Sequence, residues 1–312
     1  MRDGSSHPRA SVLIATNDHP PPLEPFFDRL FDQTAGATEY EVILADVSRW
    51  ADDPGAIARA CARKDPRLTF RILDLGRASR AAGYNRALEA SRGDLVIFFG
   101  DDCLAPATLV EAHLEHHDRH PEETAIGIGA AILTGRLREN RFAVWLEQSG
   151  DLFGVPFHDD MIGIPEHFFY VGNASVKRPF LERVGSFDER FKYHSWDDYE
   201  LGVRLNAAGM RAGYVAGAKA EHHHDLSLDE RCRVMEQAGE NARAFETKYP
   251  GKHRWQRRLR VPVWGHRLAA MQWKSLHALS GSEDILIRYY RSRLLGSFGK
   301  GYRAAGGAGR AT

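Results

Sequence analysis

The sequence predicts an α/β fold in which a mostly parallel sheet is flanked by helices. Two observations lead to this prediction. Short apolar runs alternate with longer helical patterns through the first hundred residues, and this alternation is typical of strands joined by crossover helices. Three of the runs end in polar or acidic side chains, at the edge where open α/β sheets bind ligands. The sequence therefore predicts a nucleotide pocket at the carboxyl ends of the strands.

The N-terminal third contains the clearest elements. Strands are expected at residues 11–15, 41–45, 68–73 and 95–99, and helices at residues 23–33, 54–64 and 77–91. The 95–99 segment, LVIFF, is continuously apolar, which predicts a central strand covered on both faces. No GxGxxG follows the first strand and no GxxxxGK[ST] occurs in the chain. A nicotinamide-binding domain and a P-loop NTPase are therefore both disfavoured.

Two adjacent carboxylates, Asp101 and Asp102, follow the 95–99 strand and Gly100. Paired carboxylates at a strand end can hold a hard divalent cation that is shared with substrate phosphates. The same aspartates could instead form a turn and cap a helix that begins near Pro106. On this pair alone, both interpretations stay open.

The pattern is less regular beyond residue 105. Strands are expected at residues 127–135, 173–177 and 212–218, and helices at residues 106–120, 179–184, 197–208 and 228–249, with a Gly-, Pro- and aromatic-rich loop within residues 136–170. His113, His116 and His117 share one face of the 106–120 helix. Because no helical HExxH motif accompanies them, we interpret these histidines as solvated surface side chains.

Two further clusters stand near the ends of expected elements. Trp196, Asp197 and Asp198 open the 197–208 helix. The aspartates could cap that helix, or one could be a base beside a stacking tryptophan. Later, three consecutive histidines follow the 212–218 strand. Side chains alternate in an extended chain, so His222 and His224 could point to the same side.

The charge balance and the cysteine content exclude some classes of protein. The whole chain has 42 basic and 42 acidic residues, so nucleic acid is not favoured as a partner. Three widely spaced cysteines without a CxxC pair indicate a reduced compartment and no disulfide framework. The first residues lack an apolar leader, and no apolar run approaches the roughly 18 residues of a membrane span. We therefore expect a cytoplasmic protein.

The C-terminal tail differs from the rest of the chain. Residues 252–312 contain 13 Lys and Arg against 2 Asp and Glu, which leaves 29 basic and 40 acidic residues in the remainder. Apolar side chains interleave with the basic ones at roughly helical spacing. This pattern predicts a basic helical extension. It could contact an anionic membrane surface peripherally, or pack on the body of the protein or on a second subunit in a homodimer.

Five segments, taken in order, resemble the family 2 glycosyltransferases, whose nucleotide-binding fold is called GT-A. They are SVLIATND, EVILADVS, AAGYNRALEASRGDLVIFFGDDCLAP, FYVGNASVKRPFLERVGSFDERF, and WDDYELGVRLNAAG followed by EHHH, and they span about residues 11–225. The resemblance implies a Rossmann-like GT-A domain over residues 10–250, with a nucleotide-binding half (10–105) and an acceptor-binding half (106–250). A disordered N-terminus (1–9) would precede it, and the basic extension (251–312) would follow.

The resemblance also implies roles for individual residues. Contacts to the nucleotide would come from Thr16, Asn17, Asp46, Arg80, Asn85 and Asp101. Asp102 would bind the metal together with His222 or, as the weaker alternative, His224. Asp198 would be the catalytic base, and Asn173, Trp196 and Asp197 would contact the substrate. The sequence departs from the family's D-x-D motif because Gly100 occupies its first position, which puts the affinity for metal in doubt.

The function implied by the resemblance is that of a hexosyltransferase. Such an enzyme uses Mn²⁺ or Mg²⁺ and moves a sugar from a nucleoside-diphosphate sugar, most often a UDP-sugar, to an acceptor hydroxyl with inversion. The acceptor could be a glycan, a lipid-linked sugar, a protein or a small molecule. Gly100 motivates one alternative, a decayed nucleotide-sugar-binding or scaffold protein. A sugar-phosphate nucleotidylyltransferase is another, although HPPPLEP replaces the Gly-rich basic loop that it would need. A retaining transferase is a third.

Overall fold

The computed structural model of the 312-residue chain describes most of the sequence. The described residues are 7–16, 23–47, 59, 61–150, 158, 161–193, 195–223, 227–252 and 261–307. They belong to two compact units. The first comprises the chain up to Arg136, Glu147–Glu189 and Asp197–His224, and the second comprises Leu137–Leu146, Arg190–Trp196 and the chain from Asp225 onward.

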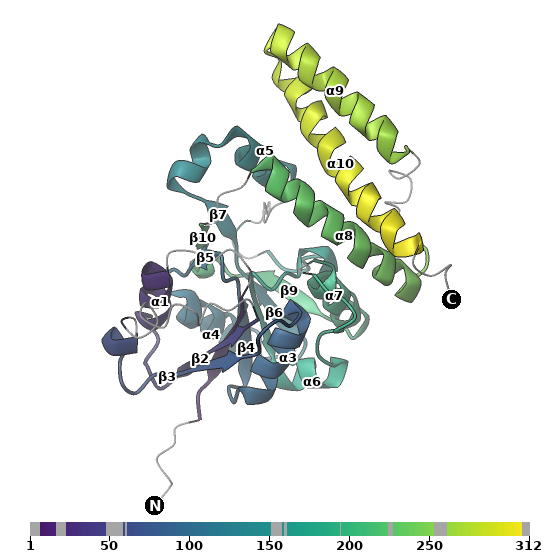
Figure 1. Cartoon of the computed structure of the whole chain (residues 1–312). Coiled ribbons are helices and arrows are strands. Elements are labelled where there is room, and N and C mark those ends of the chain that lie inside the picture. The colour runs from purple at the N-terminus through teal and green to yellow at the C-terminus, as the bar shows by residue number, and fades with distance from the viewer. Residues whose placement is uncertain are drawn as a thin grey trace, which may run out of the picture. The chain divides into compact units, whose positions relative to one another are not determined.

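The first unit contains a sheet of seven described strands (Figure 1). They are β1 (Ala10–Ala15), β2 (Tyr40–Asp46), β3 (Thr69–Asp74), β4 (Leu95–Phe99), β6 (Ala125–Ile128), β8 (Asn173–Lys177) and β9 (Arg211–Tyr214), in the order β3-β2-β1-β4-β8-β6-β9. β1 pairs in parallel with β2 and β4, and β2 with β3 and β6 with β9 are parallel too. Only β8 runs antiparallel to its neighbours, β4 and β6. The predicted mostly parallel α/β fold is confirmed.

Helices cover both faces of this sheet. Alternate residues of a strand point to opposite faces, so Val12 and Ile14 join one apolar cluster while Leu13 and Ala15 join another. The first cluster includes residues of α1 (Leu23–Phe31) and α4 (Leu109–Arg119); the second includes residues of α3 (Arg80–Ala90), α6 (Arg178–Val184) and α7 (Asp197–Ala207). Burial on both sides explains why β1, β2 and β4 are apolar at nearly every position.

A second sheet has three strands, and one of them comes from the last residues of the first unit. It contains β5 (Cys103–Leu104), β7 (Ala131–Leu133) and β10 (Ala220–His222), with β10 in the middle. β10 is antiparallel to β5 and parallel to β7, and the register sets His222 opposite Cys103. This pairing brings a histidine from the end of the unit to the loop that follows β4.

The strands and helices expected before residue 121 and described by the structure lie within three residues of their observed bounds. The expected 54–64 helix falls mostly outside the described residues. The expected 127–135 strand is wrong as a single element, because it divides into β6 and β7 in different sheets. Gly129 stands between them, where a Cβ atom would lie 2.4 Å from Asn173 Nδ2. A glycine here permits the close approach of β8.

Two other expectations in the second half are corrected. Residues 136–170, expected to be irregular, are partly helical: 3₁₀ turns form at Gly135–Glu139 and Glu166–Phe168, and α5 spans Arg141–Ser149. α5 forms because Phe142, Ala143, Trp145 and Leu146 make one buried face. The expected 212–218 strand ends early at Tyr214, and a 3₁₀ turn, Ala216–Ala218, follows it.

The second unit is helical. Its long helices are α8 (Leu228–Lys248), α9 (Val263–Ser280) and α10 (Glu283–Gly307). α8 begins with a capping box in which Ser227 and Glu230 satisfy each other's backbone N–H groups. α8 and α10 pack closely through glycines, since a Cβ atom on Gly239 would lie 2.1 Å from Phe298 O. No helix that the structure describes combines the length and apolar character that a membrane crossing requires.

Candidate active site

The strand order of the main sheet reverses at β1. The chain runs outward from β1 to β2 and β3 and then returns to β4 on the other side of β1. Crevices of this kind, at the carboxyl ends of the strands, are where open α/β sheets bind ligands. Thr16 follows β1, Asp46 ends β2, and Asp101 and Asp102 come soon after β4. The topology thus gathers the polar residues singled out in the sequence at one edge.

Thr16 and Asp46 form the side of this edge next to β2. The Thr16 hydroxyl donates to Asp46 Oδ1 at 3.1 Å and accepts from the Val47 N–H at 3.0 Å. Both side chains are almost fully buried. A buried hydroxyl that donates to a carboxylate fixes the direction of the carboxylate, so Thr16 orients Asp46. Asn17, expected beside them, lies outside the described residues.

The acidic pair follows a tightly enclosed glycine. Gly100 N donates to Gly172 O at 2.9 Å, so the chain leaving β4 is held against the turn before β8. A Cβ atom on Gly100 would lie 2.9 Å from Asp102 Oδ1 and 3.3 Å from Gly172 Cα. A side chain at this position would therefore displace the Asp102 carboxylate. The departure from D-x-D has a steric reason in this protein.

Asp102 is paired with a histidine 120 residues later in the chain. His222 Nε2 and Asp102 Oδ2 lie 3.2 Å apart, and the next backbone N–H, that of His223, donates to Asp102 O at 2.8 Å. His222 is almost fully buried, whereas the Asp102 side chain is 18% exposed. The structure thus brings together two of the three predicted metal ligands. The third, His224, lies outside the described residues.

A second pair of acids opens α7, where an arginine from α3 binds them. Arg80 donates to both oxygens of Asp197, from Nε at 3.1 Å and from a terminal nitrogen at 2.7 Å. The same arginine lies 3.6 Å from Asp198 Oδ2. Asp197 is fully buried, while the Asp198 side chain remains 20% exposed. Asp197 therefore neutralises Arg80, and Asp198 is the acid of the pair that meets solvent.

The environment of Asp198 changes its acidity. Burial and the neighbouring Asp197 charge raise the pKa of Asp198 to about 6, and Arg80 acts in the opposite direction. A carboxylate with a pKa near 6 is a stronger base than an ordinary aspartate and is still ionised at neutral pH. Asp198 is thus suited to accept a proton from a reacting hydroxyl.

Three other predicted site residues have structural partners. Asn85 donates to Phe187 O and Glu189 Oε1 and accepts from Phe187 N, at 2.8–3.0 Å. Asn173 is fully buried and donates to Ala130 O and Ala218 O. The Trp196 ring lies 5.1 Å from the Phe245 ring within the second unit. The polar atoms of Asn85 and Asn173 therefore hold the backbone of neighbouring turns.

The expectation that the α4 histidines are solvated is wrong. His113, His116 and His117 are all buried. His113 bonds Asn173 Oδ1 and Ser175 Oγ at 3.0 and 2.8 Å, and His117 bonds Ser175 Oγ at 2.9 Å. The sequence held a signal for this outcome: His113 and His116 follow the buried Leu109 by four and seven residues, which is the spacing of one buried face.

The directions of these hydrogen bonds follow from one amide. Asn173 Nδ2 donates to two carbonyls, so Asn173 Oδ1 accepts from His113 Nε2. His113 Nδ1 must then accept from the Ser175 hydroxyl, whose oxygen accepts from His117 Nε2. Burial lowers the pKa of His113 to about 4 and that of His117 to about 2. The network is thus built from neutral imidazoles and anchors α4 to β8.

Sequence reasoning missed Asn241 on α8. Its side chain donates to Tyr193 O and Ser195 O at 2.8 and 2.9 Å and accepts from Lys192 N at 3.2 Å. Ser195 and Trp196 both have positive φ, of 157° and 67°, a conformation that costs energy in non-glycine residues. Asn241 thus holds a strained segment that leads directly into Asp197. No local motif distinguishes this asparagine from a surface residue of a polar helix.

Comparison with known proteins gives consistent results. Residues 11–185 match the family described as Glycosyl transferase family 2. "Uncharacterized glycosyltransferase YfnE" of Bacillus subtilis (strain 168) is 28% identical, over 55% of this chain and 54% of that protein. The chain thus spans about half the length of that relative.

Two solved structures share the fold. The mannosyltransferase PcManGT from Pyrobaculum calidifontis, in complex with GDP-Man and Mn²⁺, has a TM-score of 0.63 at 17% identity, over 95% of this chain and 87% of that one. S. aureus TarS 1–349, in complex with UDP-GlcNAc, has a TM-score of 0.51 at 13% identity, over 96% and 92% of the two chains.

Proposed function

The chain belongs to the family 2 glycosyltransferases, and we propose that it moves a sugar from a nucleoside-diphosphate sugar to an acceptor hydroxyl with inversion. The observation that carries the proposal is the state of Asp198. It stands at the start of α7 beside the Arg80–Asp197 ion pair, keeps some exposure, and has a pKa raised to about 6. These are the properties that a general base needs near neutral pH.

The donor nucleotide is proposed to bind at the carboxyl ends of β1, β2 and β4. Asp46, held by Thr16, is assigned to the base or ribose, with Asn17 beside it by resemblance to the family. Asp101, which follows β4, is assigned to the ribose. Arg80 and Asn85 were expected to contact the nucleotide as well. Their hydrogen bonds to Asp197 and to residues 187 and 189 favour positioning roles for both.

The residues present fit a divalent cation. Asp102 Oδ2 and His222 Nε2 are 3.2 Å apart, close to the spacing of two neighbouring ligands that each lie about 2.1 Å from a cation. No three His, Cys, Asp or Glu side chains gather as a metal site in the part of the chain that the structure describes. A cation shared with a diphosphate, however, needs only one or two protein ligands. Asp102 and His222 are proposed to hold Mn²⁺ or Mg²⁺, which would stabilise the charge of the leaving nucleoside diphosphate.

The proposed reaction separates two tasks between two groups of residues. Asp198 takes the proton of the acceptor hydroxyl as its oxygen bonds to the anomeric carbon, while the bond from that carbon to the diphosphate oxygen breaks. Attack from the face opposite the leaving group inverts the configuration. General-base catalysis of this kind contributes about 10²–10⁴-fold. Arg80 lies 3.6 Å from Asp198 Oδ2 and prevents the pKa of Asp198 from rising further.

A UDP-sugar is proposed as the donor because such donors are the most frequent in the family. The two structural relatives bind GDP-Man and UDP-GlcNAc respectively, so a test must include both nucleotides. The acceptor is left open between a glycan, a lipid-linked sugar, a protein and a small molecule.

The proposal is tested by donor hydrolysis, in which water replaces the acceptor. A panel of UDP-, GDP- and dTDP-sugars is incubated with Mn²⁺ or with EDTA, and nucleotide release is measured for wild type, Asp102→Asn and Asp198→Asn. One donor should release its nucleotide only with metal, and both variants should lose at least 100-fold in rate. Asp198→Asn should still bind the nucleotide.

Three other results would contradict the proposal. Tight nucleotide binding without release from any donor, even with candidate acceptors, would indicate a decayed binding protein. Release of pyrophosphate from a nucleoside triphosphate and a sugar phosphate would indicate a nucleotidylyltransferase. A product that retains the donor's anomeric configuration would exclude inversion.

A further inference from the structure

The exposed apolar side chains of this protein are concentrated on one helix. Among the described residues, the large hydrophobic side chains that remain exposed are Ile162 and six others, all within residues 261–279. Four of those six are more than half exposed: Trp264, Leu268, Met271 and Leu279. All four lie on α9, whose opposite side contacts α10. Single exposed apolar residues are ordinary on protein surfaces, but a set on one element indicates an interaction site.

These four residues form a stripe along α9 that Ser275 interrupts once. Their spacings are four, three and eight residues, and Ser275, also exposed, divides the last into two steps of four. With 3.6 residues per turn, such spacings keep side chains on one side of a helix. The stripe, defined as Trp264, Leu268, Met271, Ser275 and Leu279, is about 22 Å long at 1.5 Å per residue. It is therefore long enough to lie along a surface.

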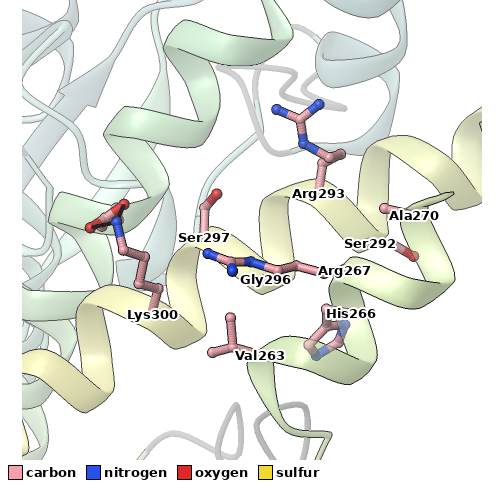
Figure 2. A pocket seen from close by; sticks show the side chains of 10 residues that line it. Val263, His266, Arg267, Ala270, Ser292, Arg293, Gly296, Ser297 and Lys300 are labelled. Carbon is pink, nitrogen blue, oxygen red and sulfur yellow. Dashed lines mark hydrogen bonds and ion pairs between the residues drawn. The ribbon is translucent and has the colours of Figure 1, made fainter.

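Cationic side chains line one edge of the stripe. Arg267 and Lys274 are both exposed on α9, and α9 contains no Asp or Glu at all. Beside this edge a groove of about 240 Å³ separates α9 from α10, and its lining includes Arg293, Lys300 and Glu236. Arg293 pairs with Asp229 and Lys300 pairs with Glu236, so Arg267 and Lys274 are the cations that mark the edge. Arg267 extends across this groove toward Ser297 (Figure 2). An apolar stripe with a basic margin is the pattern of a helix that lies in a membrane interface.

We propose that the α9 stripe docks on the surface of an anionic phospholipid bilayer. Trp264, Leu268, Met271 and Leu279 would enter the headgroup boundary, while Arg267 and Lys274 would contact lipid phosphates. Charge favours this occupant over a second copy of the chain. Residues 261–307 contain 7 Lys and Arg against 2 Asp and Glu; Arg293 and Lys300 pair with acids of α8, but α9 itself carries Arg267 and Lys274 and no acid. Two copies of α9 would bring like charges together, whereas an anionic bilayer complements them.

The test uses the full chain and measures binding to vesicles, a readout that needs neither donor nor catalysis. Wild type is floated with vesicles of pure phosphatidylcholine and with vesicles containing 30% phosphatidylglycerol, a composition chosen for the test. Wild type should bind the anionic vesicles at least tenfold more tightly, and high salt should weaken this binding. The triple variant Trp264→Ser/Leu268→Ser/Leu279→Ser should lose more than tenfold in affinity. Arg267→Gln and Lys274→Gln should each lose roughly fivefold.

A matched control lies on the same helix. Leu276 is only 37% exposed and falls outside the stripe, so Leu276→Ser should leave vesicle binding unchanged. Circular dichroism should show the same helix content in every variant, since the stripe side chains contact solvent. Equal binding by wild type and the triple variant would overturn the proposal, as would absence of binding to anionic vesicles. A wild-type dimer that the triple variant converts to a monomer would assign the stripe to a second copy instead.

Discussion

Arg80 and Asp197 form a bidentate ion pair between the start of α3 and the start of α7, with hydrogen bonds of 3.1 and 2.7 Å. The two residues are 117 positions apart. Because both side chains are largely buried, removing one partner would leave a buried charge, which costs much more than the loss of a surface pair. The pair also sets the electrostatic environment of Asp198, and the first two predictions follow from it.

The first prediction concerns the pH dependence of the wild-type reaction. Asp198 must be ionised to accept a proton, and its pKa is raised to about 6. The value of kcat/KM should therefore be constant near pH 7.5 and fall about tenfold per pH unit below pH 6. The profile is measured with saturating metal from pH 5 to 8.5. An acid limb that persists in Asp198→Asn would assign the titration to another group.

The second prediction concerns Arg80. Its charge lowers the pKa of Asp198, so Arg80→Gln should move the acid limb of kcat/KM to higher pH. Arg80→Lys keeps the charge but cannot form the planar two-bond contact. It should therefore shift the limb less and mainly lower kcat. Equal shifts in both variants would show that charge is not the means by which Arg80 acts.

The third prediction concerns the glycine before the acidic pair. Gly100→Ala should weaken Mn²⁺ binding, because the new Cβ atom would lie 2.9 Å from Asp102 Oδ1 and turn that carboxylate away. The fold should survive, since the displaced atom ends a side chain that can rotate. Gly100→Asp should act in the same direction although it completes D-x-D. Mn²⁺ affinity is measured by calorimetry with UDP present, and tighter binding in either variant would contradict this reasoning.

The fourth prediction concerns Asn241. Its amide holds residues 192–195, which precede Asp197. Asn241→Ala should release this strained segment and lower kcat by at least tenfold, with little change in the affinity for nucleotide. Thr247→Ala is a control on the same helix, because its hydroxyl bonds only to Arg243 O within α8 among the contacts described. A loss of nucleotide affinity equal to the loss of kcat would indicate general destabilisation instead.

The fifth prediction concerns stability at acid pH. Burial lowers the pKa of His113 and His116 to about 4 and that of His117 to about 2. The unfolded chain takes up protons near pH 6.5 while the folded chain does not, so stability is full above pH 6.5 and falls as the pH drops toward 4. Each histidine contributes up to about 1.4 kcal/mol per pH unit in that window.

Urea unfolding at pH 7.5, 6.0 and 5.0 measures this decline. His117→Gln should make the decline shallower, because one group no longer differs between the folded and unfolded states. His7→Gln is the matched control, since the His7 side chain is 58% exposed. A slope that is the same in wild type and His117→Gln would mean that the α4 histidines do not govern acid sensitivity.

The sequence sufficed for the strands of the first hundred residues and for the alternation that builds that part of the sheet. LVIFF is apolar at every position and SVLIA at every position except Ser11, which happens where both faces of a strand are covered. It did not suffice for the antiparallel β8, because the local pattern of residues 173–177 carries no information about strand direction. The split of residues 127–135 depends on Gly129, whose need for space arises from Asn173, 44 positions away.

The sequence predicted which residues belong to the candidate site, but it predicted fewer of the contacts that these residues make. Asp102, His222 and Asp198 could be selected by resemblance, and the pairing of Asp102 with His222 followed from β10 joining β5. Arg80 and Asn85 were expected to face the nucleotide, yet their partners are side-chain and backbone atoms of this chain. A polar residue near a site can bond either to other residues of the protein or to the ligand, and only the tertiary structure distinguishes the two.

The long separation within these pairs has a consequence for protein synthesis. His222 joins Asp102 across 120 residues, and Asp197 joins Arg80 across 117. At about 5–20 residues per second, a ribosome would add His222 roughly 6 to 24 seconds after Asp102. Until Asp198 is added, 96 residues after Asp102 (198 − 102), the nascent chain has β1, β2 and β4 but neither Asp198 nor His222. If Asp102 and His222 hold the cation as proposed, metal-dependent release of the donor's nucleotide would begin only after β10 is made.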